Sequence, residues 1–217
     1  MSIEPTFIDQ KLAAYIQGHA SGRDRALLQV EDETEAMGDI RIMQTAPEQA
    51  AFLEMLVRLG AGRAAIEVGT FTGYGAIRIA RGLEEDGRLL CLELDPERAE
   101  IARVNLDRAG VGAKVEIKIG PAIDSIRELA EEPAFDFAYV DADKTGYPDY
   151  YEELLPRMNR GGLITFDNVF MGGRILDSEP DEGTAAMQRL NDLLVEDERV
   201  DSVMLGMADG LTLARVR

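Results

Sequence analysis

Acidic and amide side chains follow two apolar segments in the second half of the chain. Asp141 comes directly after segment 135–140. Asp167 and Asn168 come directly after segment 162–166. If these segments are neighbouring strands of a parallel sheet, their carboxyl ends meet at one edge and the side chains converge. Two carboxylates and an amide oxygen suit Mg²⁺, or another hard cation such as Mn²⁺ or Ca²⁺, so the spacing predicts a metal site. Polar capping of surface strands is the alternative.

A glycine-rich turn follows an earlier apolar segment, residues 64–68. It reads Glu-Val-Gly-Thr-Phe-Thr-Gly-Tyr-Gly from Glu67 to Gly75. The glycines permit a tight turn and a close approach of a ligand to the backbone. A dinucleotide-binding turn requires glycine where Phe71 stands, and a phosphate-binding loop requires a Lys-Ser or Lys-Thr pair that does not follow here. The turn therefore suits pyrophosphate poorly, whereas Glu67 can accept hydrogen bonds from a cationic amine. A plain strand-to-helix turn is the alternative.

Glu93 lies at the end of the next apolar segment, residues 88–94. An acid at the end of the second strand of such a sheet can accept hydrogen bonds from both ribose hydroxyls of a nucleoside. Together with the glycine-rich turn, Glu93 favours a nucleoside whose other end is not phosphate. S-adenosylmethionine fits that description. Alternatively, Glu93 simply lies near the N-terminus of the helix expected from Pro96.

The chain offers few other reactive side chains. Lys144 is the only lysine at such a strand end, where it either acts on a substrate or neutralises Asp141 or Asp143. The single cysteine, Cys91, excludes an intrachain disulfide framework and is expected in the core. The single histidine, His19, excludes a multi-histidine metal centre within one chain.

The segments that must position these residues alternate between strand and helix patterns. Strands are expected at 64–68, 88–94, 115–119, 135–140, 162–166, 200–205 and 211–216, and helices at 74–81, 96–110, 123–130, 147–158 and 184–195. This alternation predicts right-handed βαβ units and a parallel sheet. Asp209-Gly210 stands between the last two strands and predicts a hairpin, which makes the last strand antiparallel to its neighbour.

The first part of the chain is polar and favours helix without any strand pattern. Thr45 and Glu48 have the spacing of a capping box and predict a helix that stops near Gly60. We expect one α/β domain in which residues 1–42 form a helical N-terminal appendage and residues 43–217 form the catalytic core.

Composition narrows the function classes. The 217 residues are 46% apolar and 29% charged, which is typical of one globular domain. The net charge of −18, from 41 acidic and 23 basic residues, disfavours nucleic-acid and membrane partners. No run approaches the roughly 18 apolar residues of a membrane span, and residues 1–7 lack the pattern of a signal peptide, so a cytoplasmic protein is expected.

From Met43 onward the sequence resembles the cation-dependent class I O-methyltransferases of the caffeoyl-CoA and catechol type. The likeness rests on the glycine-rich turn at 67–75, on Tyr-Val-Asp-Ala-Asp-Lys at 139–144, on Thr-Phe-Asp-Asn at 165–168 and on Asp-Gly-Leu-Thr-Leu at 209–213. The resemblance implies a Rossmann-like fold whose seven-stranded, mostly parallel sheet has an antiparallel last strand and helices on both faces. It also implies a homodimer.

The resemblance also implies roles for individual residues. The positions that match S-adenosylmethionine contacts are Met43, Thr45, Glu67, Gly69, Thr70, Gly75, Glu93, Ala122, Asp141 and Asp143. The positions that match metal ligands are Asp141, Asp167 and Asn168. Lys144 matches the proposed general base and, with Asp141, makes up the expected catalytic pair.

Two positions depart from the plant members of this family. Gly75 replaces a serine that contacts the cofactor, which removes one hydrogen bond. Gly172 stands where plant enzymes place an asparagine that helps to bind their substrate. This change, and the presence of only four lysines, argue against caffeoyl-CoA itself as the acceptor.

The sequence therefore predicts transfer of a methyl group to one hydroxyl of a vicinal diphenol, a small phenolic molecule. A non-catalytic S-adenosylmethionine-binding protein of the same fold is the main alternative. A haloacid-dehalogenase-type phosphatase is a remote one, because Asp141-Ala-Asp143-Lys-Thr145 matches its nucleophile motif but three predicted strands precede it. An NAD-dependent dehydrogenase is disfavoured by Phe71.

Overall fold

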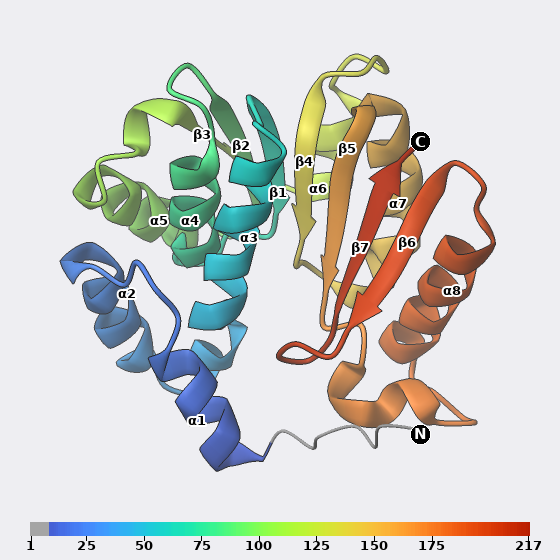
Figure 1. Cartoon of the computed structure of the whole chain (residues 1–217), viewed down its shortest axis with the longest axis horizontal. Coiled ribbons are helices and arrows are strands. Elements are labelled where there is room, and N and C mark those ends of the chain that lie inside the picture. Colours follow the sequence, from blue (N-terminus) through green and yellow to red (C-terminus); the bar gives the residue numbers. More distant parts are fainter. Residues whose placement is uncertain (1–8) are drawn as a thin grey trace.

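A seven-stranded sheet forms the centre of the protein, described for residues 9–217 by a computed structural model (Figure 1). The strand order is β3-β2-β1-β4-β5-β7-β6. The strands are β1 (Ala64–Val68), β2 (Arg88–Glu93), β3 (Val115–Ile119), β4 (Phe135–Val140), β5 (Met158–Asp167), β6 (Val200–Leu205) and β7 (Leu211–Val216). β7 runs antiparallel to both of its neighbours, β5 and β6, and the other strand pairs are parallel. The predicted α/β fold class with an antiparallel last strand is confirmed.

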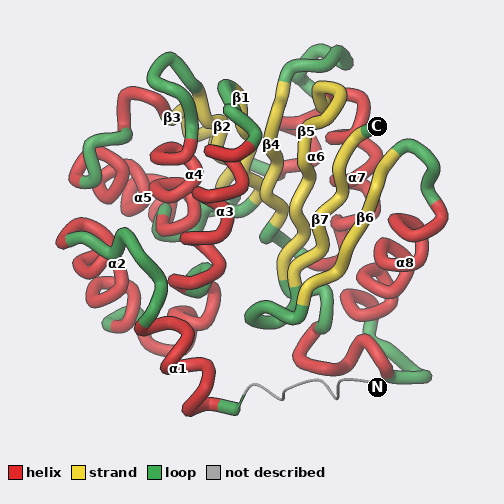
Figure 2. Tube along the Cα trace, in the orientation of Figure 1, coloured by secondary structure: helices red, strands yellow, loops and turns green. Residues whose placement is uncertain are grey.

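Helices cover both faces of the sheet (Figures 1 and 2). The helices are α1 (Gln10–Gly18), α2 (Arg25–Glu35), α3 (Pro47–Leu59), α4 (Tyr74–Gly82), α5 (Pro96–Arg108), α6 (Ala122–Arg127), α7 (Tyr147–Leu154) and α8 (Glu182–Glu196). Helices α2 to α5 share one apolar cluster with the sheet, and α6 to α8 share another. Because side chains of a strand alternate between faces, Ile66 packs in the second cluster and Ala65 in the first.

The predicted capping box at Thr45 and Glu48 is wrong. Helix α3 begins at Pro47, and its N-cap residue is Ala46, whose side chain cannot form a capping hydrogen bond. Proline favours the first helical turn and keeps the preceding residue extended, so the helix starts later than the capping-box spacing requires. The Thr45 hydroxyl instead lies 3.3 Å from the hydroxyl of Tyr139, and the helix ends at Gly60 as predicted.

Other predicted boundaries differ by a few residues. Helix α7 ends at Leu154 instead of Met158, because Pro156 lies in a 3-10 turn over Leu155–Arg157. Strand β5 then begins at Met158, four positions earlier than expected, where Met158 pairs with Phe135 of β4. Helix α6 ends at Arg127, three residues before the predicted end.

The N-terminal helix α2 packs against the sheet domain near the glycine-rich turn. Leu27 and Val30 are buried in the same cluster as α3 and α4. The Thr34 hydroxyl donates to the hydroxyl of Thr72 at 3.0 Å, and both threonines are buried. Helix α2 therefore supports the turn that follows β1.

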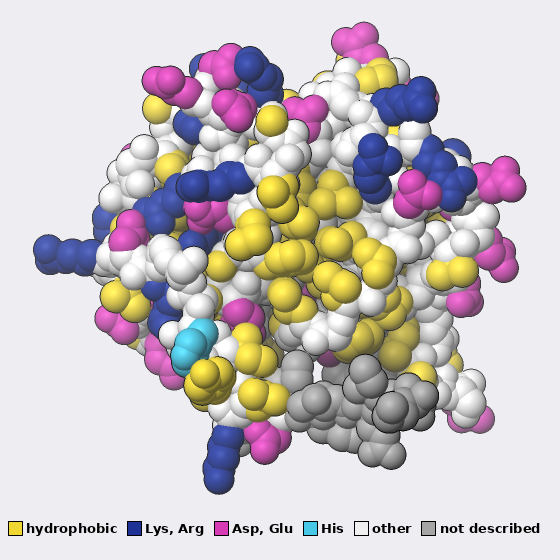
Figure 3. All heavy atoms as spheres, viewed as in Figure 1, with side chains coloured by type: hydrophobic (Ala, Val, Ile, Leu, Met, Phe, Trp, Pro, Cys, Tyr) yellow, Lys and Arg dark blue, Asp and Glu magenta, His cyan; other side chains and the backbone are white. Residues whose placement is uncertain are grey.

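One face of β5, β7 and β6 has no helix over it within residues 9–217 (Figure 1). Figure 3 shows that apolar side chains gather there. Val203 on β6 is 51% exposed, and it pairs with Leu213 of β7. Leu163 and Leu213 are only partly buried on this side of the sheet. We call this surface the apolar sheet face. Contact between its apolar side chains and water is unfavourable. None of the helices described is long and apolar enough to cross a membrane.

Candidate functional site

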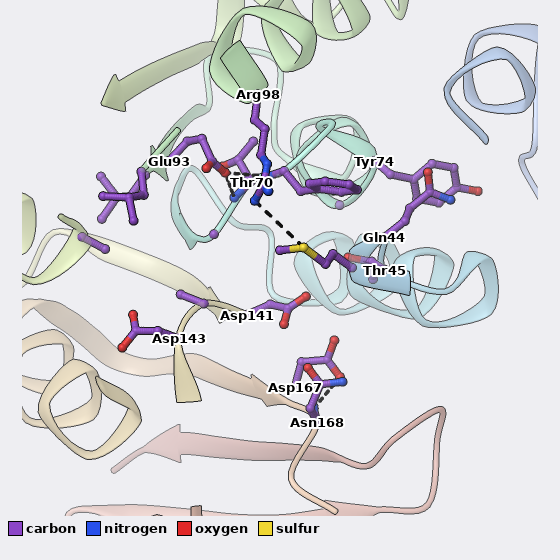
Figure 4. Close-up of a pocket in the computed structure, with 18 of the residues that line it drawn as sticks. Gln44, Thr45, Thr70, Tyr74, Glu93, Arg98, Asp141, Asp143, Asp167 and Asn168 are labelled. Carbon is purple, nitrogen blue, oxygen red and sulfur yellow. Dashed lines mark hydrogen bonds between the residues drawn. The ribbon is translucent and has the colours of Figure 1, made fainter. Parts of the chain in front are cut away.

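A cavity of about 950 Å³ opens at the carboxyl ends of β1, β2, β4 and β5 (Figure 4). This is the edge where ligands bind in open parallel sheets. Strands β4 and β5 are adjacent, as the predicted convergence of Asp141, Asp167 and Asn168 requires. Every predicted site residue except Glu67 lines the cavity, namely Met43, Thr45, Gly69, Thr70, Gly75, Glu93, Ala122, Asp141, Asp143, Lys144, Asp167 and Asn168.

Glu67 lies beneath the floor of the cavity, and only 1% of it is exposed. The Sγ atom of Cys91 donates to Glu67 Oε2 at 3.5 Å. A Cβ atom on Gly75 would lie 2.6 Å from Glu67 Oε1, so glycine at 75 makes room for the carboxyl. Burial, reinforced by the charges of Asp141 and Glu93, raises the pKa of Glu67 to about 8. Glu67 forms no ion pair with any described residue.

Gly69 brings the turn after β1 against the end of β4. Its φ angle is +91°, and a Cβ atom there would lie 2.2 Å from the carbonyl oxygen of Asp141. Only glycine tolerates both the backbone conformation and the close contact. The two strand ends are joined further by the Asp141 amide, which donates to the carbonyl of Val68 at 2.8 Å.

Glu93 holds the glycine-rich turn from the end of β2. Its Oε2 atom accepts hydrogen bonds from the amides of Thr70 at 3.2 Å and Phe71 at 2.7 Å. Its Oε1 atom accepts one from the amide of Asp95 at 3.0 Å. Each carboxylate oxygen has two lone pairs, so Oε1 keeps capacity for a ligand hydroxyl on the cavity side.

Asp141, Asp167 and Asn168 lie together at the opposite side of the cavity from Glu93 (Figure 4). Asp167 is 4% exposed, and burial together with the charge of Asp141 raises its pKa to about 6. Asp167 Oδ1 accepts the amide of Asn168 at 2.7 Å, and Asn168 adopts the left-handed conformation with φ of 58°.

This donor set fits a hard divalent cation. Two carboxylates that repel each other gain from a positive charge between them, and oxygen ligands suit Mg²⁺. Within residues 9–217, no three acidic, histidine or cysteine side chains cluster closely enough to hold a metal ion. A cation here therefore needs the amide oxygen of Asn168, and water or substrate oxygens to complete its shell.

Lys144 is held at the same side of the cavity by two oxygen atoms. Its Nζ donates to Asp141 Oδ1 at 2.9 Å and to the hydroxyl oxygen of Tyr147 at 2.8 Å. The Tyr147 hydroxyl in turn donates to the carbonyl of Val140 at 3.1 Å. Asp143 faces the neighbouring part of the cavity and accepts a hydrogen bond from the hydroxyl of Tyr150.

Sequence reasoning missed several residues of the site. Tyr139 lies on β4, two positions before Asp141. Its hydroxyl donates to Asp167 Oδ2 at 2.8 Å. Arg98 stacks over the ring of Phe71, 5.4 Å from its centroid, and approaches Met43 at the cavity mouth (Figure 4). A hydroxyl two positions before Asp141 was the available signal for Tyr139, whereas nothing local marked Arg98.

Cys91 and His19, the single cysteine and the single histidine of the chain, do not line the cavity. Cys91 is fully buried in the core, as predicted. His19 lies after α1, where its ring stacks on Tyr15 with centroids 3.9 Å apart.

The buried Oε1 atom of Gln44, which lines the cavity, has no hydrogen-bond partner among the described atoms. It can accept a hydrogen bond from a bound ligand.

Comparisons with known proteins agree with this geometry. The family model described as O-methyltransferase matches residues 17–217. A catechol O-methyltransferase of Niastella koreensis is 36% identical, with 94% of this chain and 95% of the relative covered. Tricin synthase 1 of Oryza sativa subsp. japonica is also 36% identical, with 84% and 82% covered. The crystal structure of the O-methyltransferase from Bacillus cereus in complex with SAH has a TM-score of 0.88 at 32% identity, covering 95% of this chain and 97% of that one.

Proposed function

The chain belongs to the O-methyltransferase family and is an S-adenosylmethionine-dependent enzyme, and from this premise we propose that it methylates one hydroxyl of a vicinal diphenol with the help of a divalent cation. The proposal rests on one observation: Asp141, Asp167, Asn168 and Lys144 line the same cavity of about 950 Å³. In the reaction a C–O bond forms as the C–S bond of the sulfonium breaks, and the hydroxyl proton is released.

The cofactor occupies the side of the cavity built by the turn after β1 and by the end of β2. The carboxylate of Glu67, which forms no ion pair with any described residue, is the partner of the cofactor's ammonium group. Met43, Thr45 and Gly69 border the methionine part. Glu93 accepts a ribose hydroxyl through Oε1, and Ala122, at the first turn of α6, borders the adenine. Thr70, Gly75, Asp141 and Asp143 complete the surroundings of the cofactor.

Asp141, Asp167 and Asn168 hold the cation, with Mg²⁺, Mn²⁺ or Ca²⁺ as the candidates. When bound, the cation lowers the pKa of a coordinated hydroxyl and fixes the position of the diphenol. Asp141 has a double role in this proposal, because it also accepts the hydrogen bond that orients Lys144.

Lys144 stabilises the phenolate. An ammonium group has three donors, and two of them are directed to Asp141 and Tyr147. The third can donate to an acceptor oxygen in the cavity that Lys144 lines. Since Lys144 is held as an ion-paired donor, we assign it to charge stabilisation of the oxygen that attacks the methyl group.

The acceptor is a small catechol without phosphate groups. Among the described residues that line the cavity, five are acidic and only Arg98 and Lys144 are basic. The basic groups that a CoA ester needs for its phosphates are therefore scarce. The relatives' names include both catechol and caffeoyl-CoA O-methyltransferases, and the charge of this cavity favours the first.

Incubation with S-adenosylmethionine and a panel of catechols, first with Mg²⁺ and then with EDTA, tests the proposal. We expect methylated catechol only in the presence of Mg²⁺, detected by mass spectrometry. Equal rates with EDTA would remove the cation from the proposal. No transfer to any catechol, despite tight binding of S-adenosylhomocysteine, would favour the non-catalytic alternative, and release of phosphate from a generic ester would favour the phosphatase.

Cofactor affinity should rise with pH up to about 8. In the cofactor-free protein burial first, then Asp141 and Glu93, raise the pKa of Glu67 from 4.5 to about 8, and the cofactor's ammonium favours the ionised carboxyl. The association constant for S-adenosylhomocysteine should therefore increase by up to about tenfold per pH unit below pH 8 and level off above it. Calorimetry at several pH values, without divalent cation, measures this slope.

Glu67→Gln is the matched control, because glutamine keeps the shape of the side chain and does not titrate. We expect it to flatten the pH profile and to weaken binding at pH 8. The same pKa shift makes the cofactor-free wild type less stable as pH rises from 4.5 to 8, since the folded state holds the proton that the unfolded state has released. An identical slope in the variant would contradict the role of Glu67.

A second copy of this chain covers the apolar sheet face, so the protein is a homodimer. The half-exposed Val203 on β6 and the partly buried Leu163 and Leu213 on the neighbouring strands support this. Sedimentation equilibrium should give about twice the chain mass of 23.8 kDa. Val203→Glu should shift the mass toward the monomer, whereas Val195→Glu, at a 79% exposed position on α8, should not.

We place this dimer in the cytoplasm, where a single unpaired cysteine is ordinary.

A further inference from the structure

Tyr139 belongs to a row of side chains that crosses the sheet. In the strand register, Tyr139 of β4 lies opposite Glu67 of β1, and Glu67 lies opposite Cys91 of β2. The exposed fraction of Tyr139 is 0%. A Cβ atom on Gly75 would lie 3.5 Å from Tyr139 Cε1, so the ring lies beneath the same turn as the Glu67 carboxyl.

The Tyr139 hydroxyl has all its hydrogen-bonding capacity in use. It donates to Asp167 Oδ2 at 2.8 Å. It accepts from Gln49 Nε2 at 3.3 Å, and the hydroxyl of Thr45 lies 3.3 Å away. A tyrosine hydroxyl has one hydrogen and two acceptor positions, so these three partners determine its orientation. Gln49 and Thr45 come from α3 and the segment before it, and are themselves buried.

The position of the Asp167 carboxyl follows from these contacts. The Asn168 amide donates to Oδ1 and the Tyr139 hydroxyl to Oδ2, and the side-chain amide of Gln49 lies close enough to lower the pKa of this carboxyl. Each oxygen keeps a further lone pair. Hydrogen bonds to a carboxylate fix its orientation, and metal-ligating carboxylates in known sites are supported in this way.

We propose that Tyr139 is a positioning residue that orients Asp167 for the divalent cation and ties this orientation to α3 through Gln49 and Thr45. The proposal rests on the proposed function, since it requires a cation at Asp141, Asp167 and Asn168. Tyr139 is fully buried and does not line the cavity, so its hydroxyl has no access to a diphenol or cofactor bound there. It acts through Asp167 alone.

Tyr139→Phe removes the hydroxyl and keeps the ring that fills the core. Titration calorimetry with Mn²⁺ alone, without cofactor or acceptor, should give a 10- to 100-fold weaker affinity than the wild type, the usual loss when such a supporting contact is removed. The affinity for S-adenosylhomocysteine should be unchanged, because the ring beneath Gly75 remains. The Mg²⁺ concentration for half-maximal rate should rise in parallel.

Tyr151→Phe is the matched control. Tyr151 is equally buried, and its hydroxyl donates at 2.8 Å to Asp197, which is not one of the proposed cation ligands. This variant loses one tyrosine–carboxylate hydrogen bond and should bind Mn²⁺ like the wild type. If Tyr139→Phe fails to fold by circular dichroism, Thr45→Val, which removes the hydroxyl 3.3 Å from the Tyr139 hydroxyl and keeps the side-chain shape, should lower Mn²⁺ affinity by about fivefold.

The outcomes separate the two proposals. Suppose that the wild type binds Mn²⁺ and that Tyr139→Phe, or Thr45→Val if that variant has to be used, binds it equally tightly. This result overturns the role of Tyr139 and leaves the cation site in place. A wild type that binds no Mn²⁺ overturns the cation site and with it the inference. Equal losses in Tyr139→Phe and Tyr151→Phe would assign the effect to stability, which also overturns the inference.

Discussion

Replacement of Asp141 with alanine should lower kcat/KM for magnesium-dependent methyl transfer by about 10³-fold or more. A cation that stabilises developing charge contributes several kcal/mol, and each 1.36 kcal/mol corresponds to a tenfold rate. Asp141 supplies one of only two carboxylates at the proposed cation site and also holds Lys144 at 2.9 Å. Initial rates at saturating S-adenosylmethionine over a range of Mg²⁺ concentrations measure the loss.

Two further variants make this result specific. Asp141→Asn keeps the shape and removes the charge, and it should lose nearly as much activity as the alanine variant. Asp86→Ala removes an exposed carboxylate that pairs with Arg63 at the other end of the sheet, and it should leave the rate unchanged. Normal magnesium-dependent turnover in Asp141→Ala would remove Asp141 from the proposed site.

Replacement of Lys144 with alanine should lower kcat by about 10²- to 10³-fold, the usual effect of removing one preorganised donor to a developing anion. Metal affinity should not fall. Lys144 is the cation that now pairs with Asp141, and its removal leaves that carboxylate free for a divalent ion. The loss should therefore appear in kcat while the affinity for Mn²⁺ and for S-adenosylhomocysteine is kept, as steady-state kinetics and calorimetry can measure.

Lys144→Arg distinguishes charge stabilisation from proton transfer. Arginine keeps the positive charge and cannot give up its proton. If Lys144 stabilises the phenolate, arginine should recover part of the activity that alanine loses. Activity of the arginine variant as low as that of Lys144→Ala, with wild-type cofactor binding, would instead favour the general-base role that the family resemblance implies.

The sequence predicted the fold and its class of chemistry because both depend on local patterns. Strands β1, β3, β4, β6 and β7 begin and end where the alternation of apolar residues places them. Ligands bind at the carboxyl ends of parallel strands, so the polar residues and glycines at the ends of β1, β2, β4 and β5 could be singled out before their positions were known. All of them except Glu67 line the cavity.

The same reasoning failed where the partner of a residue lies far away in the chain. Thr45 and Glu48 have the spacing of a capping box, yet Thr45 lies 3.3 Å from the hydroxyl of Tyr139, ninety-four positions away. The sequence predicts a ribose contact for Glu93, and what the structure shows is that Glu93 accepts the amides of Thr70 and Phe71. The resemblance implies that glycine at 75 removes a cofactor contact made by a serine. The structure shows a different effect, because glycine at this position makes room for the Glu67 carboxyl.

The sequence by itself thus determined the elements, the strand-end acids and the glycines of the turn after β1, because helix and strand periodicity and turn chemistry involve residues a few positions apart. The tertiary structure alone decided the adjacency of β4 and β5, the burial that raises the pKa of Glu67 and the link from α3 through Tyr139 to Asp167. These depend on strand order and register, which bring together side chains that no local pattern relates.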